Sequence, residues 1–258
     1  MKQFFYFFFM LHLVYACQAQ ANSKNEVKTH SSNSEHVDKG RQSRTDSLGA
    51  EEKKLDEFML TYGLIRVTSL QSAIKIDLKY TTSDNFMHQV LYTRIKTAYL
   101  QKDVAERLVD CQRYLTTLDS GLYLLVYDAV RPVSVQRKMW RALDSIPPKE
   151  RVKFVSNPNN RSIHNYGAAV DLTICKSDGT PLDMGAGYDD IRKIAYPSLE
   201  AAFVASGQLT REHIENRNLL RKVMNQGGFS QLSTEWWHFN ACNRKVAAKK
   251  YRVLDKEP

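Results

Sequence analysis

Apolar and polar residues follow two different periods along residues 51 to 258, and together they predict a mixed α+β fold. Apolar positions recur at helical spacing over 51–62, 102–118, 135–143, 189–204 and 211–226. Runs that read as extended chain are 65–70, 73–80, 122–130, 168–174 and 235–241. We therefore expect a single α+β domain, with helices packed against a small, mainly antiparallel sheet.

The first fifty residues follow neither period. Met1 and Lys2 precede an apolar stretch from Phe4 to Ala16, which is shorter than the roughly 20 residues of a membrane-spanning helix and predicts an export signal. A lipoprotein cleavage box would end the signal at residue 16 and lipidate Cys17, whereas an ordinary A-x-A site would end it at Ala21. Residues 22–50 are polar and read as a disordered linker, so the folded domain is expected to span 51–258.

These features predict an exported protein in the periplasm or cell envelope of a bacterium, with possible membrane attachment through a lipidated Cys17. The 258 residues are 43% apolar, enough for one ordinary core. The formal charge of +9 is spread along the chain, so the sequence gives no support for nucleic-acid binding. Oligomeric state and the pairing of the cysteines stay open.

Two segments carry the chemistry of a hydrolytic metal site. The first is Ser-x-His-x-x-Gly-x-Ala-x-Asp at 162–171, and the second is Glu-Trp-Trp-His at 235–238. A catalytic zinc uses three protein ligands and needs a carboxylate nearby to take a proton from water. His164, Asp171 and His238 are the candidate ligands, and Glu235 is the candidate base.

The spacing of these residues places conditions on the backbone. Asp171 is the only charged residue in the buried run 168–174, where a lone carboxylate is costly unless a cation pairs with it. A continuous strand would point His164 and Asp171 to opposite faces, so the chain must turn between them, and Gly167 allows that turn. Glu235 and His238 also lie on opposite faces of a regular strand, so a bulge or strand end is expected near Trp236.

The order of motifs resembles the zinc D-Ala-D-Ala metallopeptidases, and more closely the VanX-type D-alanyl-D-alanine dipeptidases. The resemblance covers about residues 64 to 258. Further matching segments are Lys79–Phe86, Tyr127–Pro132, Asp183–Asp189, Asn216–Met224 and Gly228–Phe229.

The resemblance implies roles for several further residues. Arg131 matches the arginine that stabilises the oxyanion beside zinc, and its place between an apolar run and Pro132 fits the end of a strand. The alternative is a surface ion pair of Arg131 with Asp128 or Asp119.

The family's carboxylate for the substrate amino terminus matches Asp189, although the adjacent Asp190 leaves the register open. Ser162, Tyr80 and, more weakly, Tyr92 match residues around the dipeptide.

The sequence also departs from the family pattern. Met87–Val90 stands where close relatives have a glycine and a longer spacing, and Val130 stands where many have tyrosine. These departures concern the walls of the substrate pocket rather than the metal chemistry.

The resulting hypothesis is an enzyme, a zinc dipeptidase with one Zn²⁺ per chain and a small dipeptide substrate. It would hydrolyse D-Ala-D-Ala to two D-alanines. Two alternatives stay open: a D,D-carboxypeptidase or endopeptidase acting on larger peptidoglycan peptides, and a non-catalytic zinc-binding envelope domain.

Overall fold

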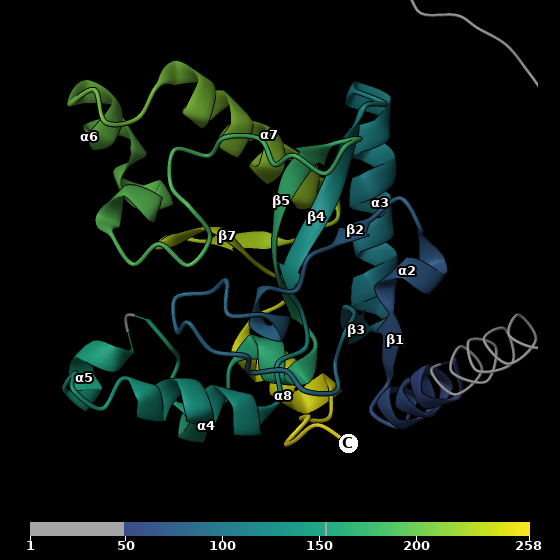
Figure 1. The fold of residues 1–258 in the computed structure, drawn as a ribbon. Coiled ribbons are helices and arrows are strands. Elements are labelled where there is room, and N and C mark those ends of the chain that lie inside the picture. The colour runs from purple at the N-terminus through teal and green to yellow at the C-terminus, as the bar shows by residue number, and fades with distance from the viewer. Residues whose placement is uncertain (1–48, 153) are drawn as a thin grey trace, which may run out of the picture. The chain divides into compact units, whose positions relative to one another are not determined.

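Five strands form the sheet that carries the candidate site, in the order β2-β4-β5-β7-β6 (Figure 1). The computed structural model describes residues 49–152 and 154–258. Strand bounds are Lys75–Ile76 for β2, Leu122–Asp128 for β4, Ala169–Lys176 for β5, Ser230–Leu232 for β6 and Glu235–Asn240 for β7. The β2–β4 pair is parallel and the other three pairs are antiparallel. The α+β fold with a small, mainly antiparallel sheet is therefore confirmed.

A separate antiparallel pair joins β1 (Leu64–Arg66) to β3 (Tyr99–Gln101). Residues 49–60 are helical. The remaining α-helices are α2 (Val67–Leu70), α3 (Lys102–Leu118), α4 (Val133–Ala142), α5 (Pro148–Arg151), α6 (Glu200–Ala205), α7 (Arg211–Gln226) and α8 (Arg244–Lys250). Short 3₁₀ turns are η1 (Lys79–Thr81), η2 (Pro158–Asn160), η3 (Ile163–Tyr166), η4 (Lys193–Ala195) and η5 (Pro197–Leu199).

The predicted signal peptide, Cys17 and nearly all of the polar linker lie outside the described residues, and they stay predictions. Within the part of the chain that the structure describes, no helix is long and apolar enough to cross a bilayer.

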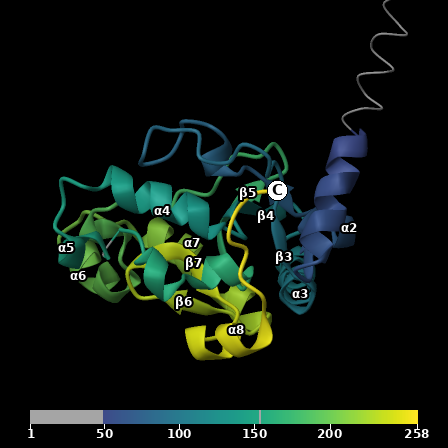
Figure 2. The ribbon, with the colours of Figure 1, turned by 90° about the horizontal axis from the view of Figure 1, so that it is seen from below.

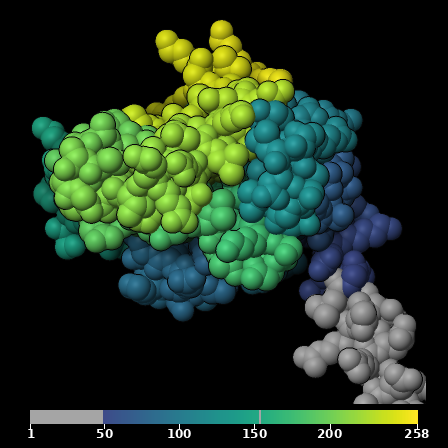
Figure 3. Space-filling model, turned by 90° about the horizontal axis from the view of Figure 1, so that it is seen from above, coloured from purple at the N-terminus to yellow at the C-terminus, as the bar shows by residue number. Residues whose placement is uncertain are grey.

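Helices α3 and α7 pack side by side, and their surfaces adjoin in the space-filling view (Figure 3). Helix α3 forms where the sequence predicts it because its buried residues, among them Val104, Leu108 and Leu115, recur at helical spacing. Helix α7 begins at a capping box in which Thr210 accepts from the His213 backbone N–H. These two helices bury their apolar stripes against the sheet.

Strand β5 is covered on both faces, as its continuous apolar sequence predicts. Val170, Leu172 and Ile174 alternate with Asp171 and Thr173, and all five are buried. Among the described residues that line the main pocket, none belongs to α3 or α7. The pocket therefore opens on the Asp171 face of the sheet, away from both helices.

Two predicted strands are shorter in the structure. The 65–70 run ends as a strand at Arg66 and continues as α2, and the 73–80 run is a strand only over β2. The carbonyl of Tyr80 accepts the backbone N–H groups of Leu91 and Tyr92, at 2.9 Å each, in place of a strand partner. The 3₁₀ turn η1 therefore stands where the end of this strand was predicted.

The prediction of a helix over 189–204 is wrong for most of its length, since α6 begins only at Glu200. Asp189 has a left-handed backbone with φ of 58°, and Pro197 lacks the N–H that a continuous helix needs. The carbonyl of Ile194 accepts from the buried Arg217 instead of from a helical N–H. Tertiary contacts here override the local pattern.

The segment after α8 runs back from that helix, as Figure 2 shows. The Leu254 N–H donates to the Asn165 carbonyl, and the Val133 N–H donates to the Leu254 carbonyl. The Glu257 carboxylate accepts the backbone N–H groups of residues 93, 94 and 95. The carboxyl-terminal segment therefore ties η3 and the start of α4 to the loop before β3.

Candidate metal centre and active site

His164 reaches the site from a 3₁₀ turn rather than from a strand. The Ser162 hydroxyl accepts a hydrogen bond from the His164 backbone N–H, and the Asn165 side-chain oxygen accepts one from the Ser162 N–H. Gly167 then reverses the chain with a φ of 64°. A Cβ at Gly167 would also meet the Leu64 side chain. The turn that the sequence requires between His164 and Asp171 is confirmed, and it depends on glycine.

Asp171 and His238 are direct partners across the antiparallel strands β5 and β7. Their side chains therefore leave the sheet on the same face, next to each other. Glu235 is the first residue of β7, and the pairing of β6 with β7 shifts register opposite it. The expected strand end and irregularity near Trp236 are confirmed. They place the Glu235 side chain beside that of His238 rather than on the opposite face of the strand.

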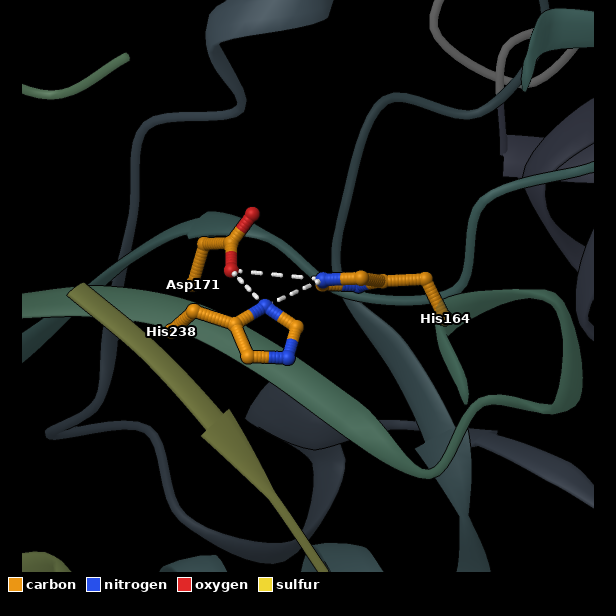
Figure 4. Close-up of side chains that lie close together, drawn as sticks. All are labelled: His164, Asp171 and His238. Atoms are coloured by element: carbon orange, nitrogen blue, oxygen red, sulfur yellow. Dashed lines mark hydrogen bonds and ion pairs between the residues drawn. The ribbon is translucent and has the colours of Figure 1, made fainter. Parts of the chain in front are cut away.

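Three ligand atoms converge on one point (Figure 4). His164 Nε2 lies 3.1 Å from His238 Nδ1 and 3.2 Å from Asp171 Oδ1, and His238 Nδ1 lies 2.9 Å from Asp171 Oδ1. Ligands held tetrahedrally at about 2.0–2.2 Å from zinc stand about 3.4 Å apart. Only a small outward movement would admit the ion.

The partner of the second ring nitrogen in each imidazole indicates which nitrogen carries the proton. His164 Nδ1 lies 2.6 Å from the Ala129 carbonyl, and His238 Nε2 lies 2.9 Å from Asn240 Oδ1. Both oxygens accept, so each of these nitrogens holds a proton, and in the neutral imidazole the facing nitrogen presents a lone pair. Two imidazole lone pairs and a carboxylate oxygen then point at one another, an arrangement that requires a cation. Such outer bonds are those of metal-binding histidines.

When no metal ion is bound, a proton on His238 can supply the positive charge at this point. Burial lowers the pKa of His238, but the hydrogen bond and charge of Asp171 outweigh it and raise the pKa to about 9. Burial likewise opposes ionisation of Asp171, yet the two histidines hold the pKa of its carboxyl far below the ordinary value. Negative charge at Asp171 is thus strongly favoured, and the donor set fits a zinc ion.

Glu235 stands beside the three ligands without joining them. Its Oε2 lies 3.8 Å from His238 Nδ1. Burial, in the company of the Asp171 charge, raises the pKa of the Glu235 carboxyl above its ordinary value. A carboxylate in this position can accept and return a proton beside the three ligand atoms.

Arg131 lies in the pocket at the end of the β4 segment, and its partner is Asp128. Arg131 Nε and Nη2 donate to Asp128 Oδ2 at 2.8 and 2.6 Å, and Nη2 also lies 3.5 Å from Asp171 Oδ2. Asp128 has no exposed surface and Arg131 is 9% exposed. The ion pair with Asp128 exists, but it is buried in the site rather than on the surface, and it aims the guanidinium at the metal position.

Asp189 lines the same pocket, and Asp190 does not. The Tyr80 hydroxyl donates to Asp189 Oδ2 at 3.0 Å, and the structure shows no ion pair to Asp189 among the described residues. Burial and the charge of Asp171 raise the pKa of the Asp189 carboxyl well above its ordinary value. Asp190 instead binds Arg192, with Nε to Oδ1 at 2.9 Å. The structure therefore brings Asp189, not its neighbour, to the metal centre.

One proposed substrate contact needs correction. Tyr92 has no exposed surface and does not line the pocket. Its hydroxyl donates to Asp128 Oδ1 at 2.5 Å, so it supports the carboxylate that holds Arg131. Ser162 and Tyr80 do line the pocket.

Three supporting groups escaped the sequence analysis as site residues. The Tyr188 hydroxyl donates to Asp171 Oδ2 at 3.2 Å, while Asn240 and the Ala129 carbonyl orient the two imidazoles. Tyr188 belongs to a segment that matched the family, which was the one available signal. A backbone carbonyl such as that of Ala129 leaves no trace in a side-chain pattern.

Arg217, which is fully buried, anchors the segment that carries Asp189. Arg217 Nε donates to the Met184 carbonyl at 2.8 Å, and Nη2 donates to the Ile194 carbonyl at 3.0 Å. These two carbonyls lie on either side of Asp189 in the chain. One guanidinium thus holds both ends of the segment.

The pocket has a volume of about 200 Å³ and contains the metal centre. Its polar side chains include Arg131, Ser162, Asp189 and Glu235, and Arg244 lies at the start of α8. A concave site with a few convergent polar groups and perturbed pKa values is typical of an active site.

Comparisons with known proteins identify the family of the chain. The family model described as D-ala-D-ala dipeptidase matches residues 60–255. The D-alanyl-D-alanine dipeptidase of Escherichia coli K12 is 35% identical over 182 residues, which cover 69% of this chain and 84% of that protein. The enzyme of the same name from Enterococcus faecium is 27% identical over 194 residues, which cover 69% of this chain and 90% of that protein.

Two solved structures also match at lower similarity. The LdcB LD-carboxypeptidase is 17% identical with a TM-score of 0.37, covering 61% of this chain and 66% of that one. A VanY D,D-pentapeptidase in complex with Zn(II) is 15% identical with a TM-score of 0.31, covering 61% and 81%. The family match spans most of the chain, and by it this protein belongs to the D-ala-D-ala dipeptidase family of M15 metallopeptidases.

Proposed function

We propose that this protein is a zinc-dependent dipeptidase that hydrolyses D-Ala-D-Ala to two D-alanines, with one zinc ion per chain. The observation that carries the proposal is the convergence of three ligand atoms with a second, separate carboxylate, that of Glu235, 3.8 Å from one of them. The relatives supply the choice of D-alanine, since their names specify it.

His164 Nε2, Asp171 Oδ1 and His238 Nδ1 would hold the metal. A zinc ion bound there supplies Lewis-acid polarisation of a carbonyl and lowers the pKa of a water ligand from 15.7 to about 7. Three protein ligands leave a coordination position open, as catalytic zinc sites do.

Glu235 is the residue that moves the proton. Its carboxylate accepts a proton from the attacking water and later delivers it to the amine of the leaving alanine. Trp237, which also lines the pocket, helps to exclude water from this carboxylate. Burial raises the pKa of the Glu235 carboxyl above its ordinary value, which makes this carboxylate a better proton acceptor.

Arg131 stabilises the negative charge that develops on the carbonyl oxygen. It is buried, it is held by Asp128, and it lies beside Asp171, so it needs little reorganisation when the charge appears. Loss of one such fixed donor typically costs about 2.7–4 kcal/mol of transition-state stabilisation.

Asp189 and Tyr80 account for the choice of a dipeptide. A free ammonium would give the Asp189 carboxylate the cation that it lacks among the described residues, in a charge-assisted hydrogen bond. An internal peptide bond has no ammonium at this distance and would leave Asp189 buried without a counter-charge. Ser162 and Arg244 line the pocket and are suited to receive the substrate carboxylate.

The test is hydrolysis of three substrates by the zinc-loaded protein: D-Ala-D-Ala, L-Ala-L-Ala and a wall pentapeptide ending in D-Ala-D-Ala. We expect cleavage of the first alone. Cleavage of the pentapeptide alone would establish a D,D-carboxypeptidase instead, and no cleavage of any of them would support a non-catalytic zinc domain.

Two variants separate metal binding from catalysis. Glu235→Gln should retain stoichiometric zinc in metal analysis and lose hydrolysis by a factor of about 10²–10⁴, the usual contribution of a general base. His164→Ala should lose the zinc itself. Full activity in Glu235→Gln would remove Glu235 from the mechanism.

The export signal, with lipidation of Cys17 as one of its two forms, is part of the same proposal. It rests on residues 1–21 of the sequence. An envelope location would place the enzyme where wall-derived dipeptides are released. Labelling of the full chain with a lipid precursor, and its loss in Cys17→Ala, would test the anchor.

A further inference from the structure

A second hollow, of about 500 Å³, adjoins the active-site pocket. Five apolar side chains form its walls, and we call it the apolar annex: Phe86, Leu143, Ile146, Phe154 and Ile191. The annex and the active-site pocket share Phe86, Phe154, Ile191 and Asp189. The two hollows therefore meet at Asp189.

Among the described residues that line the annex, only one charged group has no counter-charge. Asp190 and Arg192 also line it, but they bind each other, with Arg192 Nη2 at 2.5 Å from Asp190 Oδ2. Asp189 is the one remaining charged side chain among the described lining residues. The described part of the annex is thus an apolar surface with a single unpaired carboxyl group at its junction with the pocket.

This apolar surface is open to solvent. Ile191 is 58% exposed, and Leu143 and Ile146 are half-buried. A core position would cover such side chains, and contiguous exposed apolar surface next to a pocket marks a place where a ligand group binds.

The position of Asp189 decides which part of the substrate reaches the annex. A dipeptide bound through its ammonium to Asp189 has three further directions at the same Cα. One is the carbonyl, which must point to the metal ligands and Arg131, and one is a hydrogen. The third is the side chain of the first residue, and the annex opens beside the carboxylate that holds this residue.

We propose that the substrates of this enzyme include dipeptides whose first residue carries an apolar side chain larger than methyl, and that the annex binds this side chain. The inference rests on the proposed dipeptidase function. It concerns the first position only, because the annex meets the pocket at the group for the amino terminus.

The wall that the two hollows share includes Phe86. Phe86 is followed by Met87 and by His88, which is exposed with a left-handed backbone of φ 51°. This wall therefore continues into an exposed part of the chain.

The experiment compares kcat/KM of the zinc-loaded enzyme for D-Leu-D-Ala, D-Ala-D-Leu and D-Ala-D-Ala. Since one methylene in an apolar pocket changes kcat/KM by about tenfold or more, we expect D-Leu-D-Ala to exceed D-Ala-D-Ala by about tenfold in this half-open site. Binding to the Glu235→Gln protein, measured by isothermal titration calorimetry, should follow the same order. Hydrolysis of D-Leu-D-Ala equal to or slower than that of D-Ala-D-Ala overturns the inference.

A variant that fills the annex tests the location. Ile146 lines the annex and not the active-site pocket, so Ile146→Trp should lower kcat/KM for D-Leu-D-Ala about tenfold and leave D-Ala-D-Ala and D-Ala-D-Leu within about twofold. Leu118→Trp, at the exposed end of α3, is the matched control and should change none of them. An unchanged D-Leu-D-Ala rate in Ile146→Trp overturns the assignment of the annex.

The two proposals fail in different ways. If D-Ala-D-Ala is cleaved and D-Leu-D-Ala is cleaved more slowly, the dipeptidase function stands and the inference falls. If no D,D-dipeptide is cleaved or bound, the proposed function is refuted and the inference falls with it.

Discussion

Replacing Asp128 with asparagine should separate the placement of Arg131 from the binding of metal. Asp128 Oδ2 accepts two bonds from Arg131, at 2.8 and 2.6 Å, and neither residue is more than 9% exposed. Asparagine keeps the shape but removes the charge, and the amide can present a donor to the guanidinium. As an ion pair, Arg131 then keeps only the longer contact, 3.5 Å, to Asp171.

The magnitude follows from this geometry. Breaking a buried ion pair by removing one partner costs about 3–5 kcal/mol of folding stability. We expect a value near the lower end, about 3 kcal/mol, because Asp171 still offers Arg131 a negative charge. Turnover should fall by about 10²–10³, since the oxyanion loses a fixed donor.

The assays are urea unfolding, kcat and KM for D-Ala-D-Ala, and zinc content. Zinc should stay stoichiometric, because the three ligands are untouched. Tyr92→Phe is the matched control: it removes the 2.5 Å bond to Asp128 Oδ1 but leaves both bonds to Arg131. It should cost about 1.5–3 kcal/mol of stability and leave kcat within about threefold. A normal kcat in Asp128→Asn with reduced stability would refute the role of Arg131 in the transition state.

Three further changes test the supports of the site. Gly167→Ala should lower the unfolding free energy by at least about 1–2 kcal/mol, seen in urea unfolding, and weaken zinc affinity, because the new Cβ meets Leu64 in a left-handed backbone. Arg217→Met should raise KM for D-Ala-D-Ala about tenfold or more with a smaller change in kcat, because the Asp189 segment loses both of its anchors; steady-state kinetics of soluble, folded protein measures this. Although burial raises the pKa of Glu257, its hydrogen bonds to backbone N–H groups outweigh it and lower that pKa. Its stabilisation is therefore present above about pH 4.5 and is lost as pH falls through the lower folded pKa. Glu257→Gln should be less stable by about 1.5–3 kcal/mol at pH 7 and equal to wild type in acid, measured by thermal unfolding against pH.

The sequence predicted those elements whose pattern is decided locally. Helix α3 agrees in both bounds because its apolar stripe and its ends lie within one segment. The turn at Gly167 and the break near Trp236 were also predictable, since strand geometry forbids the ligands from meeting without them. In each case the constraint involves residues close together in the chain.

The sequence failed where a distant group decides the structure. The 189–204 segment has a helical pattern, but Arg217 on α7 takes the Ile194 carbonyl that a helix would use. Tyr80 lies in a matching segment and Tyr92 follows that segment, and nothing near them in the sequence shows that the Tyr92 hydroxyl reaches Asp128 while the Tyr80 hydroxyl reaches Asp189. The surface reading of the Asp128–Arg131 pair failed in the same way, since burial of β4 depends on the whole sheet.

The charges of the site suggest why metal and substrate belong together. Four carboxylates meet one buried guanidinium around the pocket; the carboxylates are those of Asp128, Asp171, Asp189 and Glu235, and the guanidinium is that of Arg131. A zinc ion adds two positive charges and a substrate ammonium adds one, so four positive charges then face four negative ones. The exposed Arg244 at the rim is left to match the substrate carboxylate. If only zinc or only the dipeptide is bound, the net charge of the site stays negative, which is unfavourable in a buried site. Zinc and dipeptide should therefore strengthen each other's binding, and by linkage the two effects must be equal.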